Sequence, residues 1–132
     1  MICGISHVAF EVSDMAKSVH FYCDILGFTD AFDIEGKDGK PSFKYIKIRD
    51  GEFLELIYHG LNDGSTGSYS HLCLEVDDIH EIAQRLTKNG ISLDSDVICS
   101  KNTGNFICWA SDPDGNRIEF MQLDPNSPQK RA

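Results

Sequence analysis

The hydrophobic pattern of the first half of the chain predicts a strand, a helix and three more strands. Residues 3–12 are apolar and β-branched, which is typical of a strand. Apolar residues then recur at helical spacing, so a helix is expected from Ser13 or Asp14 to about Leu26, and Gly27 suits its C-terminal cap. The remaining strands are expected near residues 28–34, 43–49 and 52–59.

The second half repeats this order of elements. A strand is expected over residues 69–76, and a helix from Asp77 or Asp78 to Asn89 with Gly90 as its cap. Three strands are expected near residues 97–100, 105–111 and 116–123. The chain is therefore predicted to form one α+β domain of two tandem βαβββ modules, which pack together or exchange partners in a dimer. The predicted boundaries are about 1–59 for module one, 60–68 for a flexible linker, 69–123 for module two and 124–132 for a frayed tail.

The repeat also carries chemistry, because each half contains one His and one Glu at matched positions. His7 and His71 are 64 residues apart (71 − 7), and so are Glu55 and Glu119 (119 − 55). Each half therefore places a His 48 residues before a Glu (55 − 7 and 119 − 71). Two equivalent halves that each supply an imidazole and a carboxylate could join at a pseudo-twofold axis and enclose one metal ion.

Strand alternation places these side chains on equivalent faces. Val8, Phe10 and Val12 share one face of the first strand and His7 lies on the other, and the same parity holds in the other three strands. The apolar face is expected to pack on helices and the other face to line a pocket. An unpaired carboxylate such as Glu55 in a closed pocket is costly or takes up a proton, and a bound cation removes that cost. The alternatives are a hydrogen-bonded strand histidine and a solvated glutamate on a half-exposed sheet.

Composition narrows the range of partners. The 132 residues are 41% hydrophobic, which allows one ordinary core. Lys and Arg total 12 against 21 Asp and Glu, a net charge of −9, so no basic patch is expected that could bind nucleic acid or an anionic membrane. The 5 cysteines form no CxxC pair and indicate reduced thiols in a cytoplasmic protein. We expect no signal peptide, and no transmembrane helix because no apolar run approaches about 18 residues.

Four segments carry a resemblance to a known family: HVAFEVSDMAKSVHFYCDILGF (7–28), GEFLELIY (51–58), HLCLEVDDI (71–79) and DPDGNRIEF (112–120). With them the chain resembles the vicinal oxygen chelate superfamily, which contains glyoxalase I, methylmalonyl-CoA epimerase, fosfomycin-resistance proteins, extradiol dioxygenases and bleomycin-binding proteins. The resemblance implies paired βαβββ modules whose curved mixed sheets enclose a divalent metal, and it implies a homodimer.

The resemblance further implies a metal-dependent lyase of the lactoylglutathione lyase type, acting in methylglyoxal detoxification. The ligand set looks like that of glyoxalase I, position by position: His7, Glu55, His71 and Glu119. One divalent ion, Ni²⁺ or Zn²⁺ with Co²⁺ or Mn²⁺ as further options, would suit it. The implied reaction isomerises a 2-oxoaldehyde–thiol hemithioacetal to a 2-hydroxyacyl thioester through an enediolate that the metal stabilises. By resemblance Glu119 is the catalytic base and Glu55 its symmetric partner.

Candidate substrate-binding residues share the strand faces of the two glutamates: Arg117, His59, Phe53 and Met121. Arg117 could meet an anionic group of the substrate or pair with a surface acid. Glutathione-using glyoxalases commonly carry Arg four residues after the first ligand and Asn four residues after the second, where this chain has Glu11 and His59. The sequence therefore does not identify the thiol that forms the hemithioacetal substrate.

Two other classes of function remain open. The first is another metal-dependent enzyme of the superfamily, such as an epimerase, a ring-cleaving dioxygenase or a thiol transferase. Epimerases typically have Gln at the position of Glu55, and dioxygenases would use only His7, His71 and Glu119. The second is a non-catalytic protein that binds an antibiotic or another small molecule. Such members of the superfamily often lack the metal ligands.

Overall fold

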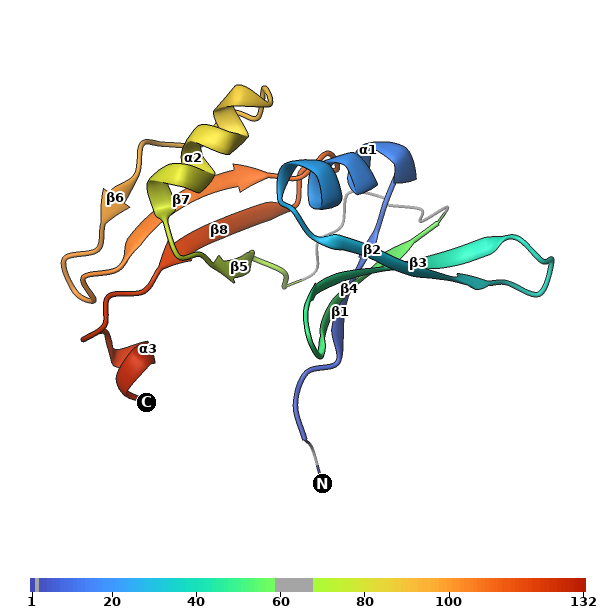
Figure 1. Ribbon diagram of the computed structural model, residues 1–132, viewed down its shortest axis with the longest axis horizontal. Helices are drawn as coiled ribbons and strands as arrows, with labels where there is room; N and C mark the ends of the chain where they lie inside the picture. Colours follow the sequence, from blue (N-terminus) through green and yellow to red (C-terminus); the bar gives the residue numbers. More distant parts are fainter. Residues whose placement is uncertain (2, 59–67) are drawn as a thin grey trace. The chain divides into compact units, whose positions relative to one another are not determined.

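The computed structural model describes residues 1, 3–58 and 68–132, and Figure 1 shows the path of the chain. The chain divides into two compact units, Met1–Ser65 and Thr66–Ala132. Each unit contains a four-stranded mixed sheet, with helix between its first two strands. This is the predicted βαβββ order, and the predicted α+β fold class is confirmed. The predicted single domain around a metal pocket stays a prediction.

The first unit contains six elements: β1 (His7–Glu11), α1 (Met15–Val19), the π-helical η1 (His20–Ile25), β2 (Thr29–Glu35), β3 (Pro41–Arg49) and β4 (Glu52–Ile57). Its strands lie in the order β1-β4-β3-β2. β1 runs parallel to β4, and the other neighbours are antiparallel. The first and last strands of the unit are therefore side by side.

The helix of the first unit begins and ends where the sequence predicted. The Asp14 side chain accepts a hydrogen bond from the backbone N–H of Lys17 at 3.1 Å, which caps the first turn. α1 continues directly into η1, so the second half of the helix is wound as a π-helix. Gly27 follows with φ of 82°, a left-handed conformation that a side chain would disfavour.

The second unit contains six elements: β5 (Leu72–Glu75), α2 (Ile79–Lys88), β6 (Ile98–Cys99), β7 (Phe106–Ser111), β8 (Arg117–Gln122) and α3 (Pro128–Arg131). Its strand order, β5-β8-β7-β6, matches the first unit, and β5 runs parallel to β8. Asp78 caps α2 by accepting from the backbone N–H groups of His80 and Glu81.

Several strands are shorter than predicted, because a strand forms only where a neighbouring strand can share backbone hydrogen bonds with it. β1 begins at His7, which lies opposite Phe53, and the turn at Asp50–Gly51 comes just before that partner strand. The apolar residues 3–6 therefore have no strand to pair with. The predicted strand 97–100 shrinks to Ile98–Cys99. Residues 59–67, which include most of the predicted linker, lie outside the described residues.

The prediction of a frayed tail was wrong for residues 127–131. Ser127 is fully buried and caps α3. The Gln129 side chain accepts a hydrogen bond from Asn105 at 2.7 Å, and Lys130 Nζ lies 2.6 Å from a carboxylate oxygen of Glu75. These long-range contacts fix a segment whose own sequence carries no hydrophobic pattern.

Burial follows the predicted alternation of faces in β4, whereas in β8 Ile118, Glu119 and Phe120 are all buried. In β4, Leu54 and Leu56 are 1% and 0% exposed, whereas Glu55 between them is partly exposed on the opposite face. The buried hydrophobic residues of the first unit are Phe10, Val12, Phe21, Tyr22, Ile25, Ile46, Leu54 and Leu56. Those of the second are Ile79, Ala83, Leu86, Cys108, Ala110, Ile118 and Phe120.

Lys44 is a charged exception in the helix-facing layer of the first unit. Its side chain is 10% exposed, and its ammonium donates to both oxygens of Asp30 at 2.9 and 3.0 Å and to Asp33 at 3.3 Å. Burial alone would lower the pKa of Lys44, but the hydrogen bonds to the two carboxylates outweigh it and raise the pKa. The stabilisation is therefore complete below the ordinary pKa of 10.5 and is lost as the pH rises through the raised value.

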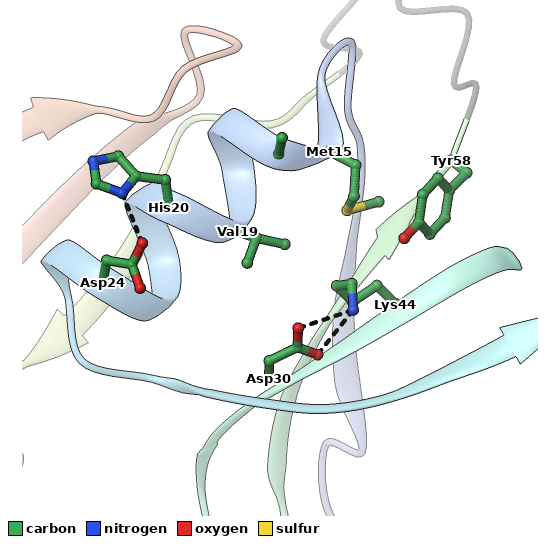
Figure 2. A pocket seen from close by; sticks show the side chains of 8 residues that line it. Met15, Val19, His20, Asp24, Asp30, Lys44 and Tyr58 are labelled. Carbon is green, nitrogen blue, oxygen red and sulfur yellow. Dashed lines mark hydrogen bonds and ion pairs between the residues drawn. The ribbon is translucent and has the colours of Figure 1, made fainter.

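The Lys44–Asp30 ion pair lies in a surface pocket of about 480 Å³. Figure 2 shows Met15 and Val19 of α1 facing this pair, with Tyr58 beside it. The residue 64 positions later, Cys108, is fully buried. The repeated fold thus accepts an apolar residue at this position, so Lys44 is a feature of the first unit alone.

Replacing Asp30 with Asn is expected to lower the free energy of unfolding by about 1–3 kcal/mol, because the buried ammonium keeps only Asp33 as a charged acceptor. Urea unfolding followed by circular dichroism measures this loss. Asp24→Asn is the matched control at the edge of the same pocket. Asp24 pairs with His20, and their side chains are 67% and 62% exposed, so the change should stay below about 0.5 kcal/mol. Equal losses in the two variants would contradict this account of Lys44.

Candidate metal centre

The first unit brings His7 and Glu55 together on the exposed side of its sheet. β1 and β4 are parallel neighbours, and Glu55 lies opposite Ala9, two residues after His7. His7 Nε2 is 3.7 Å from Glu55 Oε2, and the two side chains are 35% and 15% exposed. A carboxylate that is this far buried needs a positive or hydrogen-bonding partner.

The second unit repeats the pair with His71 and Glu119. Glu119 of β8 lies opposite Cys73 of β5, two residues after His71. His71 Nε2 is 3.3 Å from Glu119 Oε2, and the side chains are 34% and 10% exposed. The 64-residue repeat in the sequence is therefore a repeat of one atomic arrangement.

A serine contacts the other ring nitrogen of each histidine. Ser6 Oγ lies 3.4 Å from His7 Nδ1, and Ser70 Oγ lies 3.0 Å from His71 Nδ1. A partner on Nδ1 orients the ring and leaves Nε2 facing the carboxylate, as the outer partners of metal-binding histidines do. Ser6 and Ser70 were not among the predicted site residues, although a Ser precedes each histidine and belongs to the same 64-residue repeat.

An aromatic residue also faces each glutamate. Tyr45 lies opposite Glu55 and packs edge-on against His7, with ring centroids 5.5 Å apart. The Tyr45 hydroxyl donates to Glu55 Oε1 at 2.7 Å. This hydrogen bond, with partial burial and the carboxylate charge, raises the pKa of Tyr45, so the phenol stays protonated near neutral pH.

In the second unit the equivalent aromatic residue is Trp109. It lies opposite Glu119 and packs edge-on against His71 at 4.8 Å. Partial burial, followed by the negative charge of the nearby Glu119, raises the pKa of Cys73 to about 12. Cys73 is thus a neutral thiol beside the carboxylate and not a thiolate at neutral pH.

The predicted substrate-binding residues have different surroundings. Phe53 lies in an aromatic group with Tyr45 and Phe32, with ring centroids 6.2 and 6.4 Å away. The Arg117 guanidinium lies 4.1 Å from the centre of the Trp109 ring, and its Nε donates to Asp94 at 3.1 Å. Arg117 therefore pairs with a surface acid, as one alternative predicted, and its contact with an anionic group of the substrate stays a prediction.

The other two predicted substrate-binding residues are Met121 and His59. The sulfur of Met121 accepts hydrogen bonds from the amides of Asn105 and Gln129 at 3.4 and 3.6 Å, so the C-terminal segment contacts it. His59 lies outside the described residues.

The donor atoms of the second pair have the separation that a shared cation requires, and those of the first pair lie slightly farther apart. Nitrogen and oxygen ligands about 2.1 Å from a metal ion lie roughly 3–3.4 Å apart at octahedral or tetrahedral angles. The separation is 3.3 Å between His71 and Glu119, within this range, and 3.7 Å between His7 and Glu55, just above it. Within residues 1, 3–58 and 68–132 no group of three or more His, Cys, Asp and Glu could hold a metal, so each unit offers a pair of ligands.

None of the helices in the described part of the chain is both long and apolar enough to cross a membrane.

Comparison with known proteins places this arrangement in a family. The family model described as "Glyoxalase/Bleomycin resistance protein/Dioxygenase superfamily" matches residues 4–120. A lactoylglutathione lyase from Haemophilus influenzae is 29% identical over 123 residues, covering 89% of this chain and 91% of that protein. Among solved structures, an antibiotic binding protein from Streptomyces sp. CB03234 is 26% identical, with a TM-score of 0.73 over 93% of this chain and 98% of that chain. A glyoxalase I mutant from Zea mays shares the fold, with a TM-score of 0.78 at 22% identity over 90% of this chain and 45% of that chain. The chain belongs to the glyoxalase/bleomycin resistance protein/dioxygenase superfamily.

Proposed function

We propose that this chain is a metal-dependent lyase of the glyoxalase I type, which converts a 2-oxoaldehyde–thiol hemithioacetal to a 2-hydroxyacyl thioester. The main support is the His–Glu pair that recurs in both units with 3.7 and 3.3 Å between its donor atoms. Relatives named lactoylglutathione lyase support the same activity class. As parts of the proposal, the enzyme acts in the cytoplasm as a homodimer and detoxifies methylglyoxal.

The four residues that would hold the metal are His7, Glu55, His71 and Glu119. Two imidazoles and two carboxylates suit Ni²⁺ or Zn²⁺, and also Co²⁺ or Mn²⁺. When bound, such an ion supplies Lewis-acid chemistry, which polarises the two adjacent oxygens of the substrate and makes its carbon-bound proton more acidic. The contacts of Ser6 and Ser70 with the histidines support this ligand role.

Glu119 is the proposed base. The reaction moves one proton from the hemithioacetal carbon to the neighbouring carbonyl carbon, and the hydroxyl proton moves to the former carbonyl oxygen. No electron acceptor or second reactant is needed, so the step balances as an isomerisation. A carboxylate can take the first proton and return it to the adjacent carbon. Phe53 and Arg117 are proposed to contact the substrate near the two pairs.

Small-molecule binding without catalysis is the second candidate function. The likeness to an antibiotic binding protein at 26% identity favours it. A complete His–Glu pair in each unit argues against it, because simple sequestration of a drug needs neither a base nor a metal ligand. Binding of a ligand without turnover distinguishes the two candidates.

Metal analysis followed by an activity assay tests the proposal. Protein purified without added metal is expected to carry about one transition ion per chain, and to form thioester from methylglyoxal only when a thiol is present. Glutathione and other thiols are compared, because Glu11 lies where glutathione-using relatives commonly have Arg. Removing the metal with a chelator should abolish turnover, and adding it back should restore turnover. Metal-free protein with full activity would refute the proposal.

A further inference from the structure

The carboxylates of Glu55 and Glu119, which occupy equivalent positions in the repeat, differ in the side chains that contact them. The Tyr45 hydroxyl donates to Glu55 Oε1 at 2.7 Å, and the other oxygen, Oε2, is the one that faces His7. Hydrogen bonds to an ionised acceptor are among the strongest in proteins. Glu55 is therefore fixed at one oxygen and presents the second.

Glu119 has weaker support. The residue in the position of Tyr45 is Trp109, 64 residues later, and it lies opposite Glu119 in the same register. Trp109 instead carries the Arg117 guanidinium on its ring. Trp109 has no hydroxyl, so it cannot donate to Glu119 in the way that Tyr45 donates to Glu55.

We propose that Tyr45 is a positioning residue, which holds Glu55 by one carboxylate oxygen so that the other oxygen faces His7 as a metal ligand. This inference rests on the proposed function, because it assumes that Glu55 binds the metal. It follows from the way the two units differ. Both units place an aromatic ring against the histidine, but only the ring of the first unit, Tyr45, carries a hydroxyl that donates a hydrogen bond to the glutamate.

Tyr45→Phe tests this role, because it keeps the ring and removes the oxygen. The measured quantity is the dissociation constant of Zn²⁺ from the metal-free protein, obtained by competition with a chromophoric chelator. Loss of an outer partner typically weakens metal binding 10–100-fold, so we expect the dissociation constant to rise by about that factor. Tyr58→Phe is the matched control: it removes a hydroxyl that contacts Asp33 at 3.5 Å, away from Glu55. Its dissociation constant should stay within about twofold of the wild-type value.

A double-mutant cycle separates positioning from general structural damage. If Tyr45 acts through Glu55, the Tyr45→Phe change should have little further effect in a Glu55→Gln background. An equal effect in both backgrounds would overturn the inference. Tyr45→Trp, which copies the second unit, is the second variant should Tyr45→Phe fail to fold, and the same loss of affinity is expected.

The two possible failures are distinguishable. Wild-type protein that binds no Zn²⁺ or other transition ion would overturn the proposed function, and the inference with it. Wild-type protein that binds the ion, together with Tyr45→Phe protein that binds it equally tightly, would overturn only the role of Tyr45.

Discussion

Replacing Glu119 with Gln is expected to reduce kcat on the order of 10³-fold, because the amide cannot accept the proton that the substrate must lose. The two side chains have nearly the same shape, so the substitution fits the site, where the Glu119 side chain is 10% exposed. Removing a buried charge also removes its desolvation cost. The metal-free variant should therefore unfold at the wild-type temperature or above it, while its turnover is lost.

Thermal unfolding and steady-state kinetics on the same preparation separate these effects. A variant with low activity and a lowered unfolding temperature would mean general damage instead of loss of a base. Glu55→Gln provides the comparison: it should also abolish turnover, and both Gln variants should weaken Zn²⁺ binding, because each removes a proposed carboxylate ligand. Near-wild-type rates in both Gln variants would refute the mechanism.

The His–Glu pairs could be predicted from the sequence because they depend on two simple rules. Side chains alternate along a strand, which fixes the face of His7 relative to Val8. The crossover through the helix leaves β2 parallel to β1, and two antiparallel pairings, of β2 with β3 and of β3 with β4, make β4 parallel to β1 as well, so that these two strands can pair. Neither rule requires knowledge of the loops, so the same reasoning applies to Glu55 and to the second unit, whereas binding of a metal by these residues stays a prediction.

Tyr45 was missed because its place opposite Glu55 depends on strand register. The turn at Asp50–Gly51 sets that register, and a shift between Lys47 and Arg49 displaces the pairing of β3 with β4. A slip of one residue would turn Lys44 or Ile46 toward Glu55 in place of Tyr45. The hydrophobic pattern of β3 does not encode this shift.

The C-terminal segment was mispredicted for a different reason. Its order comes from side chains far away in the sequence: Lys130 meets Glu75 across 55 positions, and Gln129 meets Asn105 across 24. Pattern-based reasoning detects local periodicity, and no periodicity marks these contacts. The burial of Lys44 also depends on contacts that local periodicity does not reveal, because its ion pairs with Asp30 and Asp33 offset the cost of burying its charge.

Replacing His7 with Ala and, separately, His71 with Ala is expected to weaken binding of the single ion of the proposed site to a similar extent. A four-ligand zinc site binds with roughly 10–16 kcal/mol, so losing one ligand costs about 3 kcal/mol, or on the order of 10²-fold in affinity. The two histidines are 35% and 34% exposed, so both variants lose similar packing and serve as controls for each other. Zn²⁺ stoichiometry and affinity are measured for both. If the two units bound metal independently, each variant would keep the site of the other unit and bind an ion at wild-type affinity. Loss in both variants is therefore the result that only a site shared by the two His–Glu pairs produces, whether the pairs come from one chain or from two.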